Sequence, residues 1–224
     1  MFAPLADVAA EPAVRGYLHL HEQPNGDAFL LTHGAGADCR SKLSVDMADA
    51  LAAAGFAVLR FDLPFRQERP HGPPSFGSAS RDRDGIRRAI AVMKEKFGGR
   101  IFLGGHSYGG RQSTMLVAEE PQLVHALLLL SYPLHPPCKP AQLRTSHFPK
   151  LVTPAFFAHG TRDPFGSIAE MQSALQLIPA PHELLEIEGA GHDLRLKENP
   201  GALPANIIGK FQAFLSSCAA ASSG

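Results

Sequence analysis

At 224 residues the chain has the length of one α/β domain, since such domains commonly run to roughly 200–250 residues, and it can bury a full hydrophobic core. Its 21 Lys and Arg balance its 21 Asp and Glu, which gives no electrostatic sign of a nucleic-acid or membrane partner. The odd number and wide spacing of the cysteines argue against a disulfide framework and a zinc cluster and fit a reduced, cytoplasmic setting; they are Cys39, Cys138 and Cys218.

No targeting or membrane segment is expected. Residues 1–7 lack the basic start and the long apolar stretch of a signal peptide. The longest apolar run, 126–130, is far too short to span a bilayer and is expected to form a buried parallel strand.

The first half of the chain alternates strand-like and helix-like patterns. Apolar residues recur at helical spacing before Gly55 and again before Gly98, and these glycines are expected to end two helices. In chain order the patterns predict strands over 15–20, 28–32 and 56–61 and helices over 43–54 and 86–97. The first two strands are expected to open the sheet as an antiparallel start.

The second half continues the alternation. A capping box, Ser167 with Glu170, opens a helix that runs to Ile178, and an apolar stripe from Ile207 to Leu215 marks the last helix. Strands are predicted over 100–103, 125–131, 154–158 and 182–188, with a helix over 108–119. Strands that alternate with helices favour a mostly parallel sheet of about seven strands with helices on both faces, in a single domain over residues 1–224.

A Gly-x-Ser-x-Gly pattern, residues 105–109, has the most chemical content. An apolar strand precedes it and a helical stretch follows it, which is the strand–turn–helix context of a nucleophile elbow. Glycines suit a turn too tight for flanking side chains, and the strained turn would lift the Ser107 hydroxyl above the sheet edge. Ser107 is therefore the candidate nucleophile, and the alternative is an ordinary Gly-rich turn.

Two further motifs accompany the elbow: a His-Gly-Ala-Gly loop over 33–36, and the segment Phe-Asp-Leu-Pro-Phe over 61–65. With them the chain resembles the α/β-hydrolase superfamily over roughly residues 14–218, and within it the small dienelactone-hydrolase-like branch. That resemblance implies an α/β-hydrolase fold. One departure matters, because dienelactone hydrolases use a cysteine nucleophile where this chain has Ser107, so their substrate is not carried over.

The resemblance implies the order serine, acid, histidine along the chain. His192, in a short Gly-rich loop between the last strand and the last helix, is the candidate base; the alternative is a surface histidine. Asp163 is the candidate acid, because no Asp or Glu lies between Glu120 and Asp163, which excludes the preceding strand end. Glu188 and Asp193 are close to His192 in sequence and are less suited to orient it.

The oxyanion-hole donors are expected to be backbone N–H groups. A Gly-rich loop leaving the strand over 28–32 supplies Ala35, and the residue after the nucleophile, Tyr108, lies at a helix N-terminus. His33 in the same loop is expected to be a structural hydrogen-bonding residue.

Two Pro-rich loops, 63–80 and 132–153, are expected to border the site, and neither is long enough for a separate lid domain. The site should therefore be open, which disfavours long buried acyl chains. Residues 121–162 hold basic but no acidic side chains, and Arg111 and Arg66 are candidate substrate-binding residues for an anionic substrate. The alternative is a solvated basic face.

Together these features predict a serine hydrolase of the carboxylesterase type (EC 3.1) that cleaves a small ester or thioester through an acyl-enzyme. The triad would be Ser107, His192 and Asp163, with no metal or organic cofactor. The expected partner is a small-molecule ester, with neither nucleic acid nor membrane, in a monomer or homodimer. The alternatives are acyl transfer or peptide hydrolysis on the same triad, and a non-catalytic interaction module of this fold.

Overall fold

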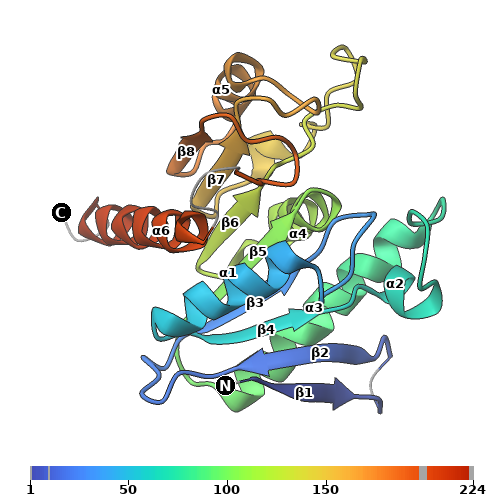
Figure 1. The fold of residues 1–224 in the computed structure, drawn as a ribbon, viewed down its shortest axis with the longest axis vertical. Coiled ribbons are helices and arrows are strands. Elements are labelled where there is room, and N and C mark those ends of the chain that lie inside the picture. The colour runs from blue at the N-terminus through green and yellow to red at the C-terminus, as the bar shows by residue number, and fades with distance from the viewer. Residues whose placement is uncertain (1, 10, 197–200, 222–224) are drawn as a thin grey trace.

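A computed structural model describes residues 2–9, 11–196 and 201–221. Over these residues one sheet of eight strands has the order β1-β2-β4-β3-β5-β6-β7-β8 (Figure 1). The strands are β1 (Phe2–Asp7), β2 (Val14–His19), β3 (Ala28–Thr32), β4 (Ala57–Phe61), β5 (Ile101–His106), β6 (Ala126–Leu130), β7 (Ala155–Gly160) and β8 (His182–Ile187). From β4 to β8 every neighbouring pair is parallel, as expected for an alternating α/β chain.

Two details of the sheet differ from the sequence-based expectation. The eighth strand is β1, an edge strand that pairs only with β2 and was not predicted. The antiparallel start is formed by β1, β2 and β4, whereas β3 lies between β4 and β5 and is parallel to both. The reason is burial: every residue of β3 is buried, as in a strand covered on both faces.

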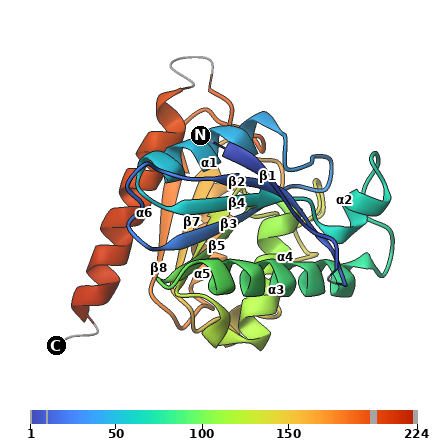
Figure 2. The ribbon, with the colours of Figure 1, turned by 90° about the horizontal axis from the view of Figure 1, so that it is seen from below.

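Helices cover both faces of the sheet, and Figure 2 shows α1 and α6 on one face with α3 and α4 on the other. The helices are α1 (Lys42–Ala53), α2 (Pro64–Glu68), α3 (Ser78–Lys96), α4 (Tyr108–Glu119), α5 (Ile168–Leu175) and α6 (Ala202–Ala221), with 3-10 turns at Pro121–Leu123 and Phe148–Lys150. Strand residues alternate between the two cores: Leu30 packs with the α3 and α4 side, and Phe29 packs edge-on against Phe211 of α6. No described helix is long and apolar enough to cross a membrane.

The first Pro-rich loop is more ordered than the sequence suggested. It contains α2, which begins with Pro64 at its first turn, and α3 already starts at Ser78. The second loop carries one 3-10 turn at Phe148–Lys150. In the described part of the chain neither loop forms a lid domain.

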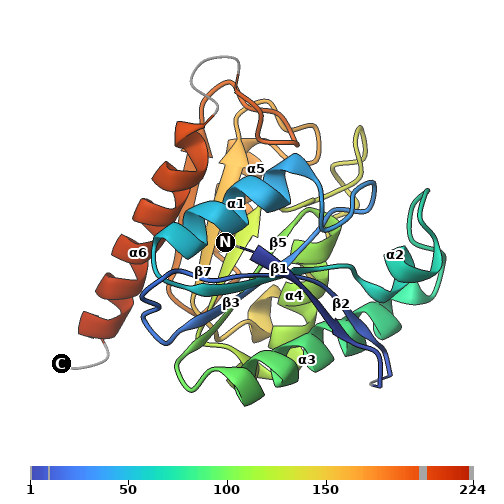
Figure 3. The same cartoon turned by 60° about the horizontal axis from the view of Figure 1, so that its bottom comes forward.

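The carboxyl ends of the parallel strands meet at one edge of the sheet. In Figure 3 loops from distant parts of the chain, coloured blue, yellow and orange, come to the same side of the molecule. This edge is where ligands bind in open α/β sheets. The residues that follow β3, β5, β7 and β8 therefore determine what chemistry this edge supports.

Candidate active site

Ser107 lies in a strained turn between β5 and α4. Its backbone has φ 51° and ψ −115°, in a region that L-residues avoid and that costs about 1–3 kcal/mol. A Cβ atom at Gly105 would collide with the side chain of Thr32, and one at Gly109 would collide with Thr32 and the carbonyl of His33. The glycines of the motif are thus needed because β3 and its loop pass directly against the turn.

Ser107, His192 and Asp163 form a continuous hydrogen-bonded chain. The Ser107 Oγ lies 2.7 Å from His192 Nε2, and His192 Nδ1 lies 2.8 Å from Asp163 Oδ2. The Asp163 carboxylate is fully buried, whereas 22% of the His192 side chain is exposed. With Nδ1–H donating to the carboxylate, Nε2 is left to accept the Ser107 proton, as in a serine-hydrolase triad.

The other two acids near His192 face elsewhere. The Glu188 carboxylate approaches the hydroxyl of Thr161, and Asp193 forms an exposed ion pair with Arg195. Asp163 also accepts a hydrogen bond from the N–H of Phe165, at 2.8 Å, which fixes its orientation.

Two histidines that the sequence did not single out hold the loops of this site. His106 donates from Nε2 to the backbone carbonyl of His192 at 2.7 Å, and burial lowers the pKa of His106 to about 4, so its ring is neutral. His159 donates from Nε2 to the carbonyl of Gly166 at 2.8 Å and thereby closes the loop that carries Asp163. The ring of Phe165 stacks on that of His192 with centroids 4.1 Å apart. Of these contacts, only the one made by His106 had a sequence signal, because His106 lies inside the Gly-x-Ser-x-Gly motif. Nothing in the sequence indicated the contacts of His159 and Phe165.

The two predicted oxyanion donors belong to the loop after β3, which contains Ala35, and to the start of α4, which contains Tyr108. Among the described residues neither the N–H of Ala35 nor that of Tyr108 donates a hydrogen bond to another residue. Gly34 lies against Ser107, because a Cβ added to it would be 3.6 Å from the serine Cβ. His33 is structural: its Nδ1 donates to the Gly34 carbonyl and its Nε2 accepts from the N–H of Leu63.

Arg66 has a different environment from the one expected of a substrate-binding residue. It is buried, and its guanidinium donates to the carbonyls of Ala35 and Ala37, each at 2.8 Å, and to those of Arg69 and Gly72, each at 3.0 Å. Four of its five N–H donors are thus engaged by backbone. Arg66 braces the loop that carries Ala35, and the expectation that it contacts substrate is corrected accordingly.

Tyr108 is anchored by a buried acid that the sequence analysis missed. Its hydroxyl donates to Asp82 of α3 at 2.6 Å, and the other oxygen of Asp82 accepts from the N–H of Phe65. Burial raises the pKa of Asp82 and also that of Tyr108. This contact joins α2, α3 and α4 directly behind the elbow.

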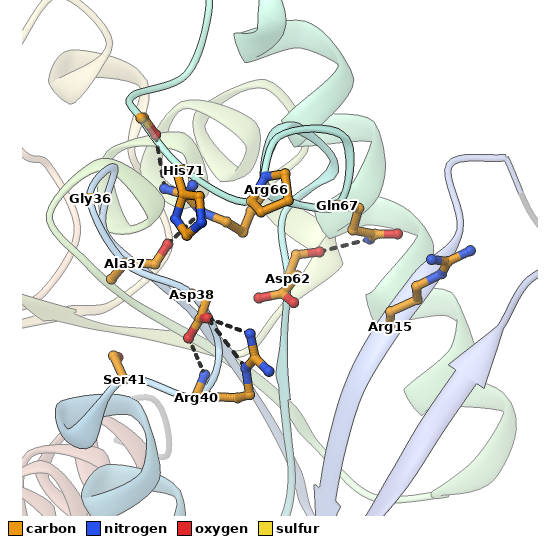
Figure 4. Close-up of a pocket in the computed structure, with 12 residues that line it drawn as sticks. Arg15, Gly36, Ala37, Asp38, Arg40, Ser41, Asp62, Arg66, Gln67 and His71 are labelled. Carbon is orange, nitrogen blue, oxygen red and sulfur yellow. Dashed lines mark hydrogen bonds and ion pairs between the residues drawn. The ribbon is translucent and has the colours of Figure 1, made fainter.

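Two pockets flank the loop after β3. Figure 4 shows the first, about 590 Å³, whose lining includes Arg15, Asp38, Arg40, Asp62 and His71. The second, about 530 Å³, has a mixed lining in which apolar residues such as Met47, Leu194 and Ile207 predominate, and it lies between α1, α6 and the residues that follow His192. Arg111 lies one helical turn after Ser107, where its N–H donates to the Ser107 carbonyl.

The likeness to known proteins extends over nearly the whole chain. The dienelactone hydrolase from Anabaena variabilis shares 23% identity and a TM-score of 0.75, over 96% of this chain and 97% of that chain. An α/β serine hydrolase without a lid from Xanthomonas campestris shares 16% identity and a TM-score of 0.73, over 94% of each chain. Est1E from Butyrivibrio proteoclasticus shares 15% identity and a TM-score of 0.74, over 95% of this chain and 99% of that chain.

The expected fold is thereby confirmed, including its likeness to dienelactone hydrolase. Residues 25–219 match the family described as an alpha/beta hydrolase domain. The chain therefore belongs to the α/β-hydrolase family.

Proposed function

We propose that the protein is a serine hydrolase of the carboxylesterase type that cleaves a small ester or thioester. The single observation that carries this proposal is the Ser107–His192–Asp163 chain of hydrogen bonds at the carboxyl edge of the sheet. A lone serine is a weak nucleophile, and an adjacent neutral imidazole is what activates it.

In the proposed reaction the Ser107 Oγ attacks the carbonyl carbon while His192 Nε2 accepts the hydroxyl proton. The N–H groups of Ala35 and Tyr108 would stabilise the oxyanion, and the α4 dipole acts in the same sense. His192 then passes the proton to the departing alcohol or thiol, which leaves an acyl group on Ser107. Water attacks this ester with His192 again as base, and the acid and free Ser107 are released.

The first test compares hydrolysis of p-nitrophenyl esters of several acyl lengths by wild type and Ser107→Ala. The variant should keep its fold and lose activity by a factor on the order of 10⁴ or more. Ser131→Ala is a matched control, because Ser131 is buried at the end of the neighbouring strand β6 and also has a positive φ of 47°. Full activity in Ser107→Ala, with loss in Ser131→Ala, would contradict the assignment of the nucleophile.

A further inference from the structure

Two arginines beside the elbow lie close together. Arg111 is on the first turns of α4, and its spacing of four residues places it on the same side of the helix as Ser107. Arg144 belongs to the loop after β6, where its N–H donates to the carbonyl of Leu134 and its own carbonyl accepts from the Tyr132 hydroxyl at 2.7 Å. These contacts fold the loop back on itself, and a side-chain contact between His147 and Thr114, 2.9 Å, holds it against α4.

No carboxylate in the described part of the chain pairs with either arginine. The Nε of Arg111 is buried without a hydrogen-bond partner, and Arg144 makes one side-chain contact, from Nη1 to the Pro133 carbonyl at 3.3 Å. Other arginines of the same helical layer are paired, since Arg87 contacts Glu120. The segment 121–162 holds no Asp or Glu at all.

The pKa shifts of two residues near Arg111 agree with a positive charge that no carboxylate neutralises. Burial, followed by the positive charge of Arg111, lowers the pKa of Arg144. The same two causes lower the pKa of His147 to about 4, and the ring of His147 contacts the Thr114 hydroxyl on α4. Like charges held together away from water are unfavourable unless an anion joins them.

The polar pocket of Figure 4 does not offer the same chemistry. There the Arg40 guanidinium is paired with Asp38, and Arg66 is held by backbone carbonyls. Arg15 also lines that pocket and has no ion-pair partner in the part of the chain that the structure describes, but it is exposed to solvent. Arg111 and Arg144 are half-buried and have no carboxylate partner among the described residues, and they lie on the side of the elbow where α4 begins.

Building on the proposed serine-hydrolase function, we propose that Arg111 and Arg144 bind a carboxylate on the acyl part of the substrate. A guanidinium donates two parallel hydrogen bonds to a carboxylate, which suits it to this task. One helical turn advances roughly 5.4 Å, so the carboxylate would be a few carbon atoms from the scissile carbonyl. The substrate class is a monoester or monothioester of a short dicarboxylic acid.

The kinetic test uses two esters of equal acyl length, p-nitrophenyl hydrogen glutarate and p-nitrophenyl pentanoate. Wild type should have the higher kcat/KM for the glutarate ester. Arg111→Gln and Arg144→Gln should each lower that value at least about tenfold, the size expected for loss of a charge-assisted hydrogen bond, and should leave the pentanoate ester within about twofold. Lys139→Gln removes one exposed positive charge from the same loop and should change neither value. Equal loss for both esters, or an equal loss in Lys139→Gln, would overturn the carboxylate site.

A binding test separates this proposal from the proposed function, because it needs no turnover. Glutarate should raise the melting temperature of wild type and of Ser107→Ala, and the shift should disappear in Arg111→Gln and be partly restored in Arg111→Lys. Neutral glutaramide should give no shift. A shift in Ser107→Ala without any esterase activity in wild type would support the anion site and count against the hydrolase. No shift with glutarate, or an equal shift with inorganic phosphate, would overturn the assignment to a carboxylate.

Discussion

The tautomer of His192 decides what Ser107 can do. Asp163 accepts from Nδ1 at 2.8 Å with a fully buried carboxylate, so the ring is oriented with Nε2 toward the serine. An amide in place of the carboxylate would present an N–H group to the same nitrogen and favour the wrong tautomer.

Asp163→Asn should therefore preserve the fold and lower kcat by ~10⁴, the cost of the corresponding change in the triad template. Steady-state kinetics of ester hydrolysis measure this change in kcat directly. Asp193→Asn and Glu188→Gln are the matched controls and should stay near wild type, because these acids contact Arg195 and Thr161 instead. The opposite pattern would show that another acid orients His192.

The hydrogen bonds of Arg66 to the loop after β3 allow a second test. Arg66→Gln removes donors to the carbonyls of Ala35 and Ala37 and should lower kcat by up to about 10²-fold, since one misplaced oxyanion donor costs that much or more. KM for a neutral ester should change little. Arg69→Gln is the control, because Arg69 is exposed and its carbonyl, which Arg66 contacts, is unchanged. A rise in KM at constant kcat would point instead to direct substrate binding by Arg66.

Helices, strands and loops of the site are joined by contacts between residues far apart in the chain. His106 at the end of β5 holds the loop after β8 through the His192 carbonyl, across 86 positions. The contact requires a proton on Nε2, and in the neutral ring that burial favours this leaves Nδ1 without a proton.

His106→Leu should therefore reduce kcat by about tenfold or more, because the His192 loop loses a buried hydrogen bond and its near-attack geometry loosens. His106→Gln is the conservative partner, since its amide N–H reaches a similar position and should restore part of the rate. If His106→Leu and His106→Gln had the same kcat, the hydrogen bond to the His192 carbonyl would not be what positions His192.

Most elements and Ser107 could be predicted from local pattern, whereas His192 and Asp163 also needed the order of the three residues that the family resemblance implies. Ser107 needs a strand, a glycine turn and a helix, and Asp163 was reached by the absence of any other acid in a long stretch. Strand β1 escaped prediction because Pro4 argues against a strand and because its residues lie on an exposed edge of the sheet, without the alternation of a half-buried strand. The roles of Arg66 and Asp82 depend on contacts between distant segments, which no local pattern encodes.

For the whole molecule, half-buried histidines link stability to pH. Burial lowers the pKa of His106 and of His147 to about 4, from an ordinary value of 6.5. Between these values the unfolded chain binds protons that the folded chain excludes, so the free energy of unfolding falls as the pH is lowered from 6.5 toward 4.

The urea midpoint should accordingly be lower at about pH 4.5 than at about pH 7. His147→Gln should reduce that difference, because it removes one of the two groups, whereas His21→Gln should leave it unchanged because His21 is exposed. An identical pH dependence in all three proteins would show that His147 does not contribute.

The proposed mechanism requires Ser107 to act as a nucleophile that becomes covalently modified. The most direct measurement is mass spectrometry of the protein after reaction with a fluorophosphonate, followed by peptide mapping of the adduct. One adduct per chain is expected, located on Ser107. It should be absent from Ser107→Ala and should form much more slowly in Asp163→Asn. An adduct on another residue, or no adduct on a folded wild-type protein, would contradict the proposed mechanism.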